Sequence, residues 1–518
     1  MDELIDVAVV GGGAAGLSAA VALARFRRSV VVFDAGDQRN APAGHVHNFL
    51  TRDGTPPGDL YDLGRQELAS YGGRIVPSRV DSVSRIDDER FRVTAGDQAF
   101  LARRVLFATG SRDELPAVPG LDRQWGRGVL HCPYCHGWEV RGQRIGVLAT
   151  SPMGVHQALM FRQLSEDVTL IVHEGAAPTG EAADQLAALG IAVAAGPVAE
   201  VETADDAVTG VRLGDGTRVP LDAVVVAPFV RARSELLDPL GAEVTQLIIG
   251  DVAVATHVAA GPAGTTGVPG VFVAGNVADP MAQVVSSAAG GLAAAGALNN
   301  DLITADAAAA AQRHRDHFWS EDAWDERYRE HAQRFSGNPN AVLLAEVAGL
   351  APGSAIDVGA GEGADAVWLA SRGWRTTAAE LSTVALERSV AAAAAAGVEI
   401  ETLHLDVVRD DVPGSYDLVT SSFVHVPGDA RRVLFTRLAA AVAPGGTLLV
   451  LGHDLADLQS SVERQHLAEA GWSAEHVAAT LGDGWVVDTC EARPRAVRNH
   501  DGEQVVVHDA VLRAHRRS

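Results

Sequence analysis

Two cysteines at C-x-x-C spacing are the residues of this chain best suited to chemistry. Cys132 and Cys135 lie in the segment HCPYCHG, and His136 follows them directly. A dithiol at this spacing can close to a small disulfide ring and exchange with another thiol pair, because nearby positive charge or a helix N-terminus stabilises its thiolate. The same letters also fit c-type haem attachment and a zinc site that uses both histidines and both cysteines. Because the chain has only three cysteines and we expect a reducing cytosol, we favour a catalytic pair.

A glycine-rich loop near the start of the chain, the first loop, has the spacing of a dinucleotide-binding turn. The run Gly11-Gly12-Gly13-Ala14-Ala15-Gly16 follows a β-branched stretch and precedes a helix-like stretch. Asp34 ends the next strand-like run, 18 residues after Gly16, where an acid can bind a ribose hydroxyl. Glycines allow the tight turn and the close approach of the backbone to a pyrophosphate. The sequence therefore predicts a βαβ nucleotide-binding unit over residues 5–34.

A second strand, turn and helix pattern over residues 143–173 lacks the first glycines of such a loop. This nested loop reads Ala149-Thr150-Ser151-Pro152-Met153-Gly154, so Cβ atoms stand where a backbone would have to approach a pyrophosphate. No arginine occurs between Gln163 and Val211, and the chain has no lysine, so a 2′-phosphate would find no cationic partner there. The pattern argues against NADPH, and Glu174 at the strand end leaves NADH open.

A third loop carries an acid before its glycines. It reads Asp357-Val358-Gly359-Ala360-Gly361-Glu362-Gly363, and Glu380 ends the next strand-like run 23 residues after Asp357. Asp357 can orient the loop and a methionine amine, while Glu380 can bind both hydroxyls of a ribose. Asp406, after a further strand-like run, can accept from an adenine amine. The order predicts a site for S-adenosylmethionine (SAM), separate from the first loop.

Length and charge exclude several functions. The 518 residues exceed one hydrophobic core, and a net charge of -24 with a pI near 5.1 argues against binding to nucleic acid or an anionic membrane. The absence of lysine excludes Schiff-base and lysine-base mechanisms. The N-terminal residues lack a signal-peptide pattern and no run of 18 apolar residues occurs, so we expect a soluble, cytoplasmic protein.

The order of motifs in residues 1–305 resembles that of thioredoxin-reductase-like flavoproteins. The motifs are the first loop, a strand end at Ala108-Thr109-Gly110, the cysteine pair and the Gly275-Asn276 segment. The resemblance implies a homodimer in which Cys135 lies nearest the isoalloxazine of FAD and Cys132 meets substrate thiols. It also implies FAD binding by Gly11, Gly13, Ala14, Ala15, Gly16, Asp34, Arg39, Asn48, Ala108, Thr109, Gly110, Gly275, Asn276, Gln283 and Val284.

His136 and the nested loop depart from the thioredoxin reductases, in which an acid follows the second cysteine and the nested unit binds NADPH. Both departures resemble the dithiol oxidases of gliotoxin and holomycin biosynthesis, which pass electrons from a substrate dithiol through flavin to oxygen. This resemblance gives His136 the role of the base that takes a thiol proton, with a hydrogen-bonded structural histidine as the alternative. His45 and His47 either face the flavin or lie in a surface loop.

Residues 320–518 resemble class I SAM-dependent methyltransferases. The resemblance assigns SAM binding to Asp357, Gly359, Gly361, Gly363, Glu380 and Asp406. The stretches at 324–328 and 335–340 look more narrowly like the thiopurine and tellurite-resistance methyltransferases, whose acceptors are soft sulfur or chalcogen atoms. A thiolate attacks a sulfonium methyl directly once it is aligned, so this chemistry needs no dedicated base.

Five further residues of this region could contribute to the site or be purely structural. Trp319, Trp324 and Tyr328 either cap the methyl donor or stack on the acceptor, or they belong to the core. His425 either touches the acceptor or packs within a loop. Cys490 is predicted to be an inert buried thiol.

Together the patterns predict an α/β protein, a flavoprotein with two nested Rossmann-like dinucleotide-binding domains followed by a Rossmann-like class I methyltransferase. We expect the FAD domain at 1–115 and 246–304, the nested domain with the cysteine pair at 116–245, a linker at 305–325 and the methyltransferase at 326–518. We predict a bifunctional enzyme that oxidises thiols or dithiols and methylates a small-molecule thiol, without a metal, nucleic-acid or membrane partner. An NAD(P)H-dependent reductase of protein disulfides and a redox switch that controls the methyltransferase are the alternatives.

Overall fold

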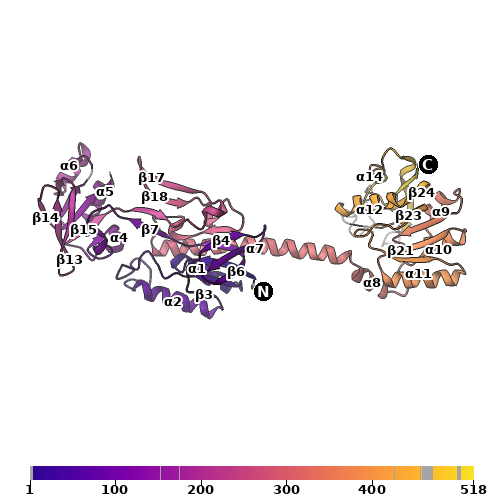
Figure 1. The fold of residues 1–518 in the computed structure, drawn as a ribbon, viewed down its shortest axis with the longest axis horizontal. Coiled ribbons are helices and arrows are strands. Elements are labelled where there is room, and N and C mark those ends of the chain that lie inside the picture. The colour runs from indigo at the N-terminus through magenta and orange to yellow at the C-terminus, as the bar shows by residue number, and fades with distance from the viewer. Residues whose placement is uncertain are drawn as a thin grey trace. The chain divides into compact units, whose positions relative to one another are not determined.

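The computed structural model describes residues 4–151, 153–173, 175–424, 426, 428–455, 457, 471–498 and 503–518. The chain divides into two compact units, Met1–Ala307 and Ala308–Ser518 (Figure 1). Each unit contains a mainly parallel sheet connected by helices, so the predicted α/β class is confirmed. Within the described ranges, no helix combines the length and the apolar character that crossing a membrane requires.

The largest sheet of the first unit carries the first loop. Its strands lie in the order β3-β2-β1-β6-β5-β4 with β19 beside β6, and β1, β2, β3, β6 and β19 run parallel. All of β2 and most of β1 are buried, as expected for apolar strands of a sheet covered on both faces. The elements are β1 (Leu4–Val10), α1 (Ala14–Arg25), β2 (Val30–Phe33), α2 (Pro57–Ser70), β3 (Arg74–Val76), β4 (Ser82–Arg85), β5 (Phe91–Ala95), β6 (Gln98–Phe107) and β19 (Val271–Val273).

A second parallel sheet, β11-β10-β9-β15-β8, carries the nested loop between β9 and α5. Its elements are β8 (Val129–Leu130), β9 (Ile145–Ala149), α5 (Met153–Phe161), β10 (Val168–Val172), α6 (Glu181–Ala188), β11 (Ala192–Ala195) and β15 (Ala223–Val226). The chain enters through α3 (Leu121–Gln124), and α4 (Pro133–His136) holds the second cysteine. The β9-α5-β10 arrangement is therefore a βαβ unit, like β1-α1-β2.

Two smaller sheets and three short helical turns complete the first unit. One sheet has the order β12-β13-β14 and the other β17-β18-β16-β7. The elements are β7 (Ser111–Glu114), β12 (Val198–Ala204), β13 (Ala207–Leu213), β14 (Arg218–Pro220), β16 (Phe229–Ala232), η1 (Asp238–Leu240), β17 (Val244–Ile249), β18 (Val252–Val258), η2 (Pro262–Gly264) and η3 (Gly275–Val277).

The second unit is a single sheet in the order β22-β21-β20-β23-β24-β26-β25. The first five strands are parallel, whereas β26 is antiparallel to both of its neighbours. The third loop joins β20 to α10 in the middle of this sheet. The elements are α8 (Glu321–Arg329), α9 (Ala341–Val347), β20 (Ser354–Val358), α10 (Ala364–Ser371), β21 (Arg375–Glu380), α11 (Thr383–Ala396), β22 (Glu401–His404), β23 (Tyr416–Ser422), α12 (Gly428–Ala440), β24 (Val442–His453), α14 (Ala474–Ala478), β25 (Trp485–Arg498) and β26 (Gln504–Arg516).

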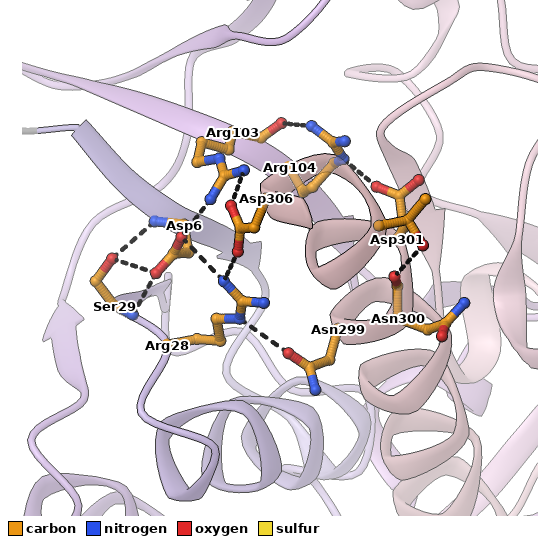
Figure 2. Close-up of polar contacts among 10 residues, drawn as sticks. Asp6, Arg28, Ser29, Arg103, Arg104, Asn299, Asn300, Asp301 and Asp306 are labelled. Carbon is orange, nitrogen blue, oxygen red and sulfur yellow. Dashed lines mark hydrogen bonds and ion pairs between the residues drawn. The ribbon is translucent and has the colours of Figure 1, made fainter. Parts of the chain in front are cut away.

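Helix α7 (Val284–Phe318) runs from the first unit through much of the stretch expected to be a linker. Its part that precedes the unit boundary is held by a network of ion pairs (Figure 2). The carboxylate of Asp306 contacts Arg28 at 2.8 Å and Arg103 at 2.6 Å, and Asp301 pairs with Arg104. Because Arg103 and Arg104 belong to β6, these pairs attach α7 to the first sheet, and a network of charges stabilises more than isolated surface pairs do.

Candidate active sites

The first loop connects β1 to α1 with two glycines that no other residue could replace without strain. Gly11 has a φ of +116°, and a Cβ on it would overlap the carbonyl oxygen of Ala108. A Cβ on Gly16 would overlap the carbonyl oxygen of Gly11. In contrast, a Cβ on Gly13 would meet no atom within 4 Å, because this position is open. Gly11 and Gly16 therefore shape the turn, and Gly13 leaves room beside it.

A cavity of about 1320 Å³ extends from this loop to the cysteine pair. It exceeds the roughly 300–1,000 Å³ typical of a small-molecule site, so it has room for more than one ligand. Most of the residues predicted to bind FAD or to do chemistry line it: Gly11, Gly13, Ala14, Ala15, Asp34, Arg39, Ala108, Thr109, Gly110, Cys132, Cys135, His136, Gly275, Asn276, Gln283 and Val284.

Two residues predicted to bind FAD lie outside the lining of this cavity. Gly16 packs against the backbone of Gly11 instead. The Asn48 side chain donates from Nδ2 to the carbonyl oxygen of Tyr134 at 2.7 Å, and its backbone N–H donates to Asp53. Asn48 thus holds the turn between the two cysteines, a role that the linear sequence does not indicate.

Four residues that line the cavity each have a buried polar atom without a hydrogen-bond partner in the described part of the chain. These atoms are Asn40 Nδ2, Ser111 Oγ, His136 Nε2 and Gln157 Oε1. Buried polar groups are nearly always hydrogen-bonded, so unpartnered ones around a cavity indicate a polar ligand. Asn40, Ser111 and Gln157 were not predicted from the sequence; only the position of Ser111 directly after Ala108-Thr109-Gly110 could have suggested it.

Charged residues at the cavity are fixed by partners of opposite charge. The Asp34 carboxylate receives hydrogen bonds from Arg65 at 3.1 Å and from the backbone N–H of Gly36 at 2.9 Å. Arg39 donates to Asp113 at 2.6 Å, with the Arg39 side chain 19% exposed and that of Asp113 8% exposed. The positive charge of Arg39 favours the thiolate form of both cysteines, and by itself it acts to lower the pKa of each. An acid at the strand end and a shaped glycine turn are what FAD requires of a βαβ unit.

The cysteine pair forms the start of a one-turn helix, with Cys132 as N-cap and Cys135 within α4. The Cys135 thiol donates to the Cys132 sulfur at 2.6 Å. This bond, with help from the Cys135 and Tyr134 N–H groups, lowers the pKa of Cys132 to about 7 against the effect of burial. The same bond raises the pKa of Cys135. In the reduced pair Cys132 therefore carries the thiolate and Cys135 keeps its proton.

Two histidines flank the pair and both are neutral near pH 7. Burial and the charge of Arg39 lower the pKa of His131 to about 4, and its ring stacks on Trp125 with centroids 5.6 Å apart. Burial also lowers the pKa of His136. His45 and His47 line the cavity, and His47 Nε2 lies 3.3 Å from a Glu139 carboxylate oxygen. A neutral His136 with an unpartnered ring nitrogen can accept a proton.

The nested loop faces the same cavity with side chains where the first loop has glycines. Thr150, Ser151 and Met153 contribute to the lining, and Thr150 Oγ1 donates to the Ala227 carbonyl oxygen at 3.2 Å. A Cβ on Gly154 would come within 2.6 Å of the Ala149 Cβ, so Ala149 packs directly against the start of α5. Pro152 and Glu174, which entered the nicotinamide prediction, lie outside the described residues.

The third loop has the same kind of glycine turn, with buried acids around it. Gly359, Gly361 and Gly363 all have positive φ, and a Cβ on Gly359 would overlap the Val424 side chain. Asp357 is fully buried at the end of β20, where burial and the charge of Asp365 raise its pKa to about 8. Its carboxyl group accepts from Thr420 Oγ1 at 2.8 Å.

Glu380 at the end of β21 is fastened to the third loop. Its carboxylate accepts from the backbone N–H of Gly361 at 2.9 Å and from those of Leu381 and Ser382. Burial nevertheless raises its pKa. Several buried carboxyls with raised pKa values favour a cationic ligand, and SAM carries a sulfonium and an amine. Asp406 is only partly buried and accepts from the backbone N–H of Val408 at 3.0 Å.

Aromatic residues of α8 and the following segment surround the third loop. Tyr328 is buried, its hydroxyl lies 3.1 Å from where a Gly361 Cβ would be, and its ring centroid is 6.2 Å from that of Phe335. Trp324 lies 6.0 Å from Tyr328, and the Arg327 guanidinium covers the Trp324 ring. The ring of Trp319 lies 4.8 Å from that of Phe318. Tyr328 and Phe335 therefore lie directly beside Gly361 of the loop.

Two further residues of this unit were singled out from the sequence, His425 and Cys490. His425 lies outside the described residues. Cys490 belongs to β25 and is partly buried, and burial raises its pKa, so its thiol stays protonated near pH 7. Among the described residues no group of histidines, cysteines and acids could hold a metal ion.

Comparison with known proteins agrees with the two units. Residues 5–291 match the pyridine nucleotide-disulphide oxidoreductase family, and residues 355–446 match a methyltransferase domain. Thioredoxin reductase sirT of Leptosphaeria maculans is 33% identical over 325 residues, which cover 59% of this chain and 97% of the relative. Thioredoxin reductase tcpT of Claviceps purpurea is 34% identical, over 46% of this chain and 78% of the relative.

Solved structures agree as well. The crystal structure of HlmI is 44% identical, with a TM-score of 0.55, over 60% of this chain and 96% of HlmI. An oxidoreductase from Agrobacterium tumefaciens is 32% identical, also with a TM-score of 0.55, over 58% of this chain and 99% of its own. The family match implies FAD and the methyltransferase match implies SAM, and the cavity and the buried acids fit these groups. The chain is therefore an enzyme that belongs to the pyridine nucleotide-disulphide oxidoreductase family, and it carries a methyltransferase domain after its thioredoxin-reductase-like flavoprotein fold.

Proposed function

We propose that the first unit is a dithiol oxidase and that the second methylates a small-molecule thiol. The oxidase reaction converts a dithiol and oxygen into a cyclic disulfide and hydrogen peroxide, so two electrons and two protons pass from substrate to oxygen. The observation that carries this proposal is the composition of one cavity. Its lining combines the first loop, Cys132 and Cys135, a neutral His136 and a nested loop without glycines at its first positions.

The residues of the chain supply thiol exchange and proton transfer. A substrate thiolate attacks the Cys132 sulfur of the protein disulfide, which breaks the bond to Cys135 and forms a mixed disulfide. The second substrate thiol then displaces Cys132, whose pKa of about 7 makes it a good leaving group. His136 accepts the thiol proton at its unpartnered Nε2. FAD, when bound, takes the electron pair of the reduced cysteines and gives it to oxygen.

The nested loop supports oxygen rather than a nicotinamide as the electron partner. Dinucleotide loops use glycines so that the backbone can approach the pyrophosphate, but Ala149 and Ser151 carry side chains here, and Ser151 faces the cavity. The stretch from Gln163 to Val211 offers no arginine to a 2′-phosphate. We therefore propose that NADPH is not used.

The second unit is proposed to transfer the methyl group of SAM to a thiol. The third loop, Glu380 and the raised pKa of Asp357 support SAM, while the aromatic pair Tyr328 and Phe335 supports a flat or soft acceptor beside it. A thiolate needs alignment but no dedicated base. Because disulfide formation hides a thiol and methylation caps it, we propose that both units act on one sulfur compound.

Peroxide release tests the oxidase proposal. FAD-loaded wild type and a Cys135→Ser variant are mixed with dithiothreitol in air, and hydrogen peroxide is measured. We expect release to fall by about 100-fold or more in the variant, because a disulfide cannot form without both sulfurs. Cys490→Ser is the matched control and keeps the wild-type rate. Equal release from wild type and Cys135→Ser would exclude a dithiol oxidase.

The second candidate is an NAD(P)H-dependent disulfide reductase. The observation that favours it is that the relatives from Leptosphaeria maculans and Claviceps purpurea carry the name thioredoxin reductase. This candidate requires that a reduced nicotinamide bleach the flavin without oxygen at a rate that supports turnover. It also requires that the wild type reduce a disulfide with NADPH or NADH as the electron donor when no dithiol is added.

A further inference from the structure

We propose that Glu362 and Arg388 are positioning residues of the methyl-donor site, because together they hold residues 328–335 on the third loop before SAM binds. The inference rests on the SAM-dependent reaction proposed for the second unit. Glu362 lies within the third loop, and Arg388 lies on α11. The segment that they hold begins at Tyr328 and ends at Phe335, so it carries both aromatic residues that lie beside the loop. This pair, the clamp, gives the site a wall that is formed without the ligand.

The Glu362 carboxylate holds the end of the segment by its backbone. It accepts from the N–H of Arg334 at 3.1 Å and from that of Phe335 at 3.0 Å. Burial acts to raise the pKa of Glu362, but these N–H groups and Arg388 outweigh it, so the pKa is lowered. Glu362 is therefore ionised near pH 7, and hydrogen bonds to a charged acceptor are stronger than neutral ones. They fix the backbone from which the Phe335 ring extends.

Arg388 holds the start of the same segment and joins it to Glu362. Its Nη1 donates to the Glu362 carboxylate at 2.8 Å. Its Nη2 donates to the carbonyl oxygens of Tyr328 at 2.6 Å and His331 at 2.9 Å. These carbonyls lie at the C-terminal end of α8, where carbonyl groups lack helical partners and a cation is favourable. One planar guanidinium therefore connects the end of α8 to the third loop, which a lysine in its place could not do with the same geometry.

A second acid attaches the chain that follows the segment. Asp365, in the first turn of α10, accepts from the N–H of Asn340 at 2.6 Å and from Ser422 Oγ at 2.9 Å. Asn340 in turn caps α9 with its side chain. Residues 328–340 are thus attached at both ends to the third loop or to the helix that follows it. The entropy cost of ordering this wall therefore falls on folding and not on SAM binding, which favours tight binding.

Calorimetric titration of the FAD-loaded full chain with SAM tests the clamp. We expect Glu362→Gln and Arg388→Met each to weaken SAM binding by about tenfold, because each removes the charged partner of the other. In the double variant the loss should be no larger than about that of the more affected single variant, because the two side chains act as one unit. Glu387→Gln is the matched control, since it removes the same charge from an exposed residue of α11 and should change the affinity less than about twofold.

Hydrogen exchange tests whether the clamp is formed before SAM arrives. The backbone N–H groups of Arg334 and Phe335 donate to Glu362, so their exchange reports on the clamp directly. Without SAM, we expect a peptide of residues 332–337 to exchange about tenfold faster in Glu362→Gln than in the wild type. Peptides from β20 should exchange equally in both proteins, because the fold of the unit is kept.

Four results would overturn the inference while leaving methyl transfer in place. They are an unchanged SAM affinity in the single variants, whether or not their melting temperatures fall, additive losses in the double variant, equal exchange of the 332–337 peptide in wild type and Glu362→Gln, and protection of that peptide in the wild type only after SAM is added. The failure of the wild type to bind SAM would overturn both this inference and the proposed methyl transfer.

Discussion

The first loop and the nested loop occupy the same place in two βαβ units, but they differ in the side chains that stand beside the turn. At the first loop, Gly11 and Gly16 pack backbone against backbone, and Gly13 stays open to the cavity. At the nested loop, Ala149 covers Gly154, and the side chains of Thr150 and Ser151 enter the lining of the same cavity. A βαβ fold is therefore kept although side chains stand where the first loop has glycines. A βαβ unit therefore does not by itself imply a bound dinucleotide.

The largest effect is expected at Gly11. We predict that Gly11→Ala destabilises the first unit by about 3 kcal/mol, because the methyl group overlaps Ala108 and the positive φ is strained. Gly13→Ala should cost about 1 kcal/mol or less, since nothing lies near that Cβ, but it should still lower FAD content. Flavin absorbance and thermal unfolding separate the two outcomes. Full FAD content in Gly13→Ala would mean that the open side of the loop is not where the cofactor lies.

The third loop extends the comparison to a glycine turn with its own acid. We predict that Glu380→Ala weakens SAM binding by about 100-fold, because three backbone N–H groups lose their acceptor and the loop loses its shape. Asp406→Ala should weaken it by about tenfold or less, since Asp406 is half-buried and accepts one backbone bond. Calorimetric titration with SAM measures both. Equal losses of SAM affinity in the two variants would show that the hydrogen bonds of Glu380 to the loop do not contribute to SAM binding.

The cysteine pair lies between the two loops of the first unit in the sequence, and the reactivity of its thiols depends on pH. We predict that alkylation of the reduced protein at Cys132 accelerates as pH rises through about 7, because only the thiolate reacts and its pKa is lowered to that value. Cys135 and Cys490, whose pKa values are raised, should react far more slowly at pH 7. Mass spectrometry of iodoacetamide-treated protein gives the rate at each site. A midpoint for Cys132 above about 8.5, the ordinary value for a thiol, would contradict a stabilised thiolate.

The smallest effect is expected when glycines are returned to the nested loop. We predict that an Ala149→Gly and Ser151→Gly double variant raises the rate of flavin bleaching by NADPH by less than about tenfold. The stretch from Gln163 to Val211 contains no arginine that could bind the 2′-phosphate of NADPH. Stopped-flow absorbance at the flavin band measures this rate. A much larger increase in rate would show that the missing glycines alone prevent the use of NADPH.

Much of the fold followed from local pattern. The glycine turns, the acids at strand ends and the alternation of strands and helices are set by neighbours in sequence, so the α/β class and the positions of the first and third loops could be predicted. The role of Asn48 could not, because it depends on Tyr134, a partner far along the chain. The continuity of α7 beyond Ala307 is not marked by any motif, although its alanine-rich stretch favours helix, and the linker at 305–325 stays a prediction.

An anaerobic titration of the FAD-loaded protein tests directly whether a dithiol or a nicotinamide reduces the flavin. The dithiol and the reduced nicotinamide are added in separate experiments, and the flavin absorbance is followed. If the cysteine pair feeds the flavin and the nested loop holds no nicotinamide, dithiothreitol bleaches the flavin rapidly in the wild type and not in Cys135→Ser, while NADPH and NADH bleach it only slowly. Rapid bleaching by NADPH or NADH, with none by the dithiol, would exclude the proposed dithiol oxidase.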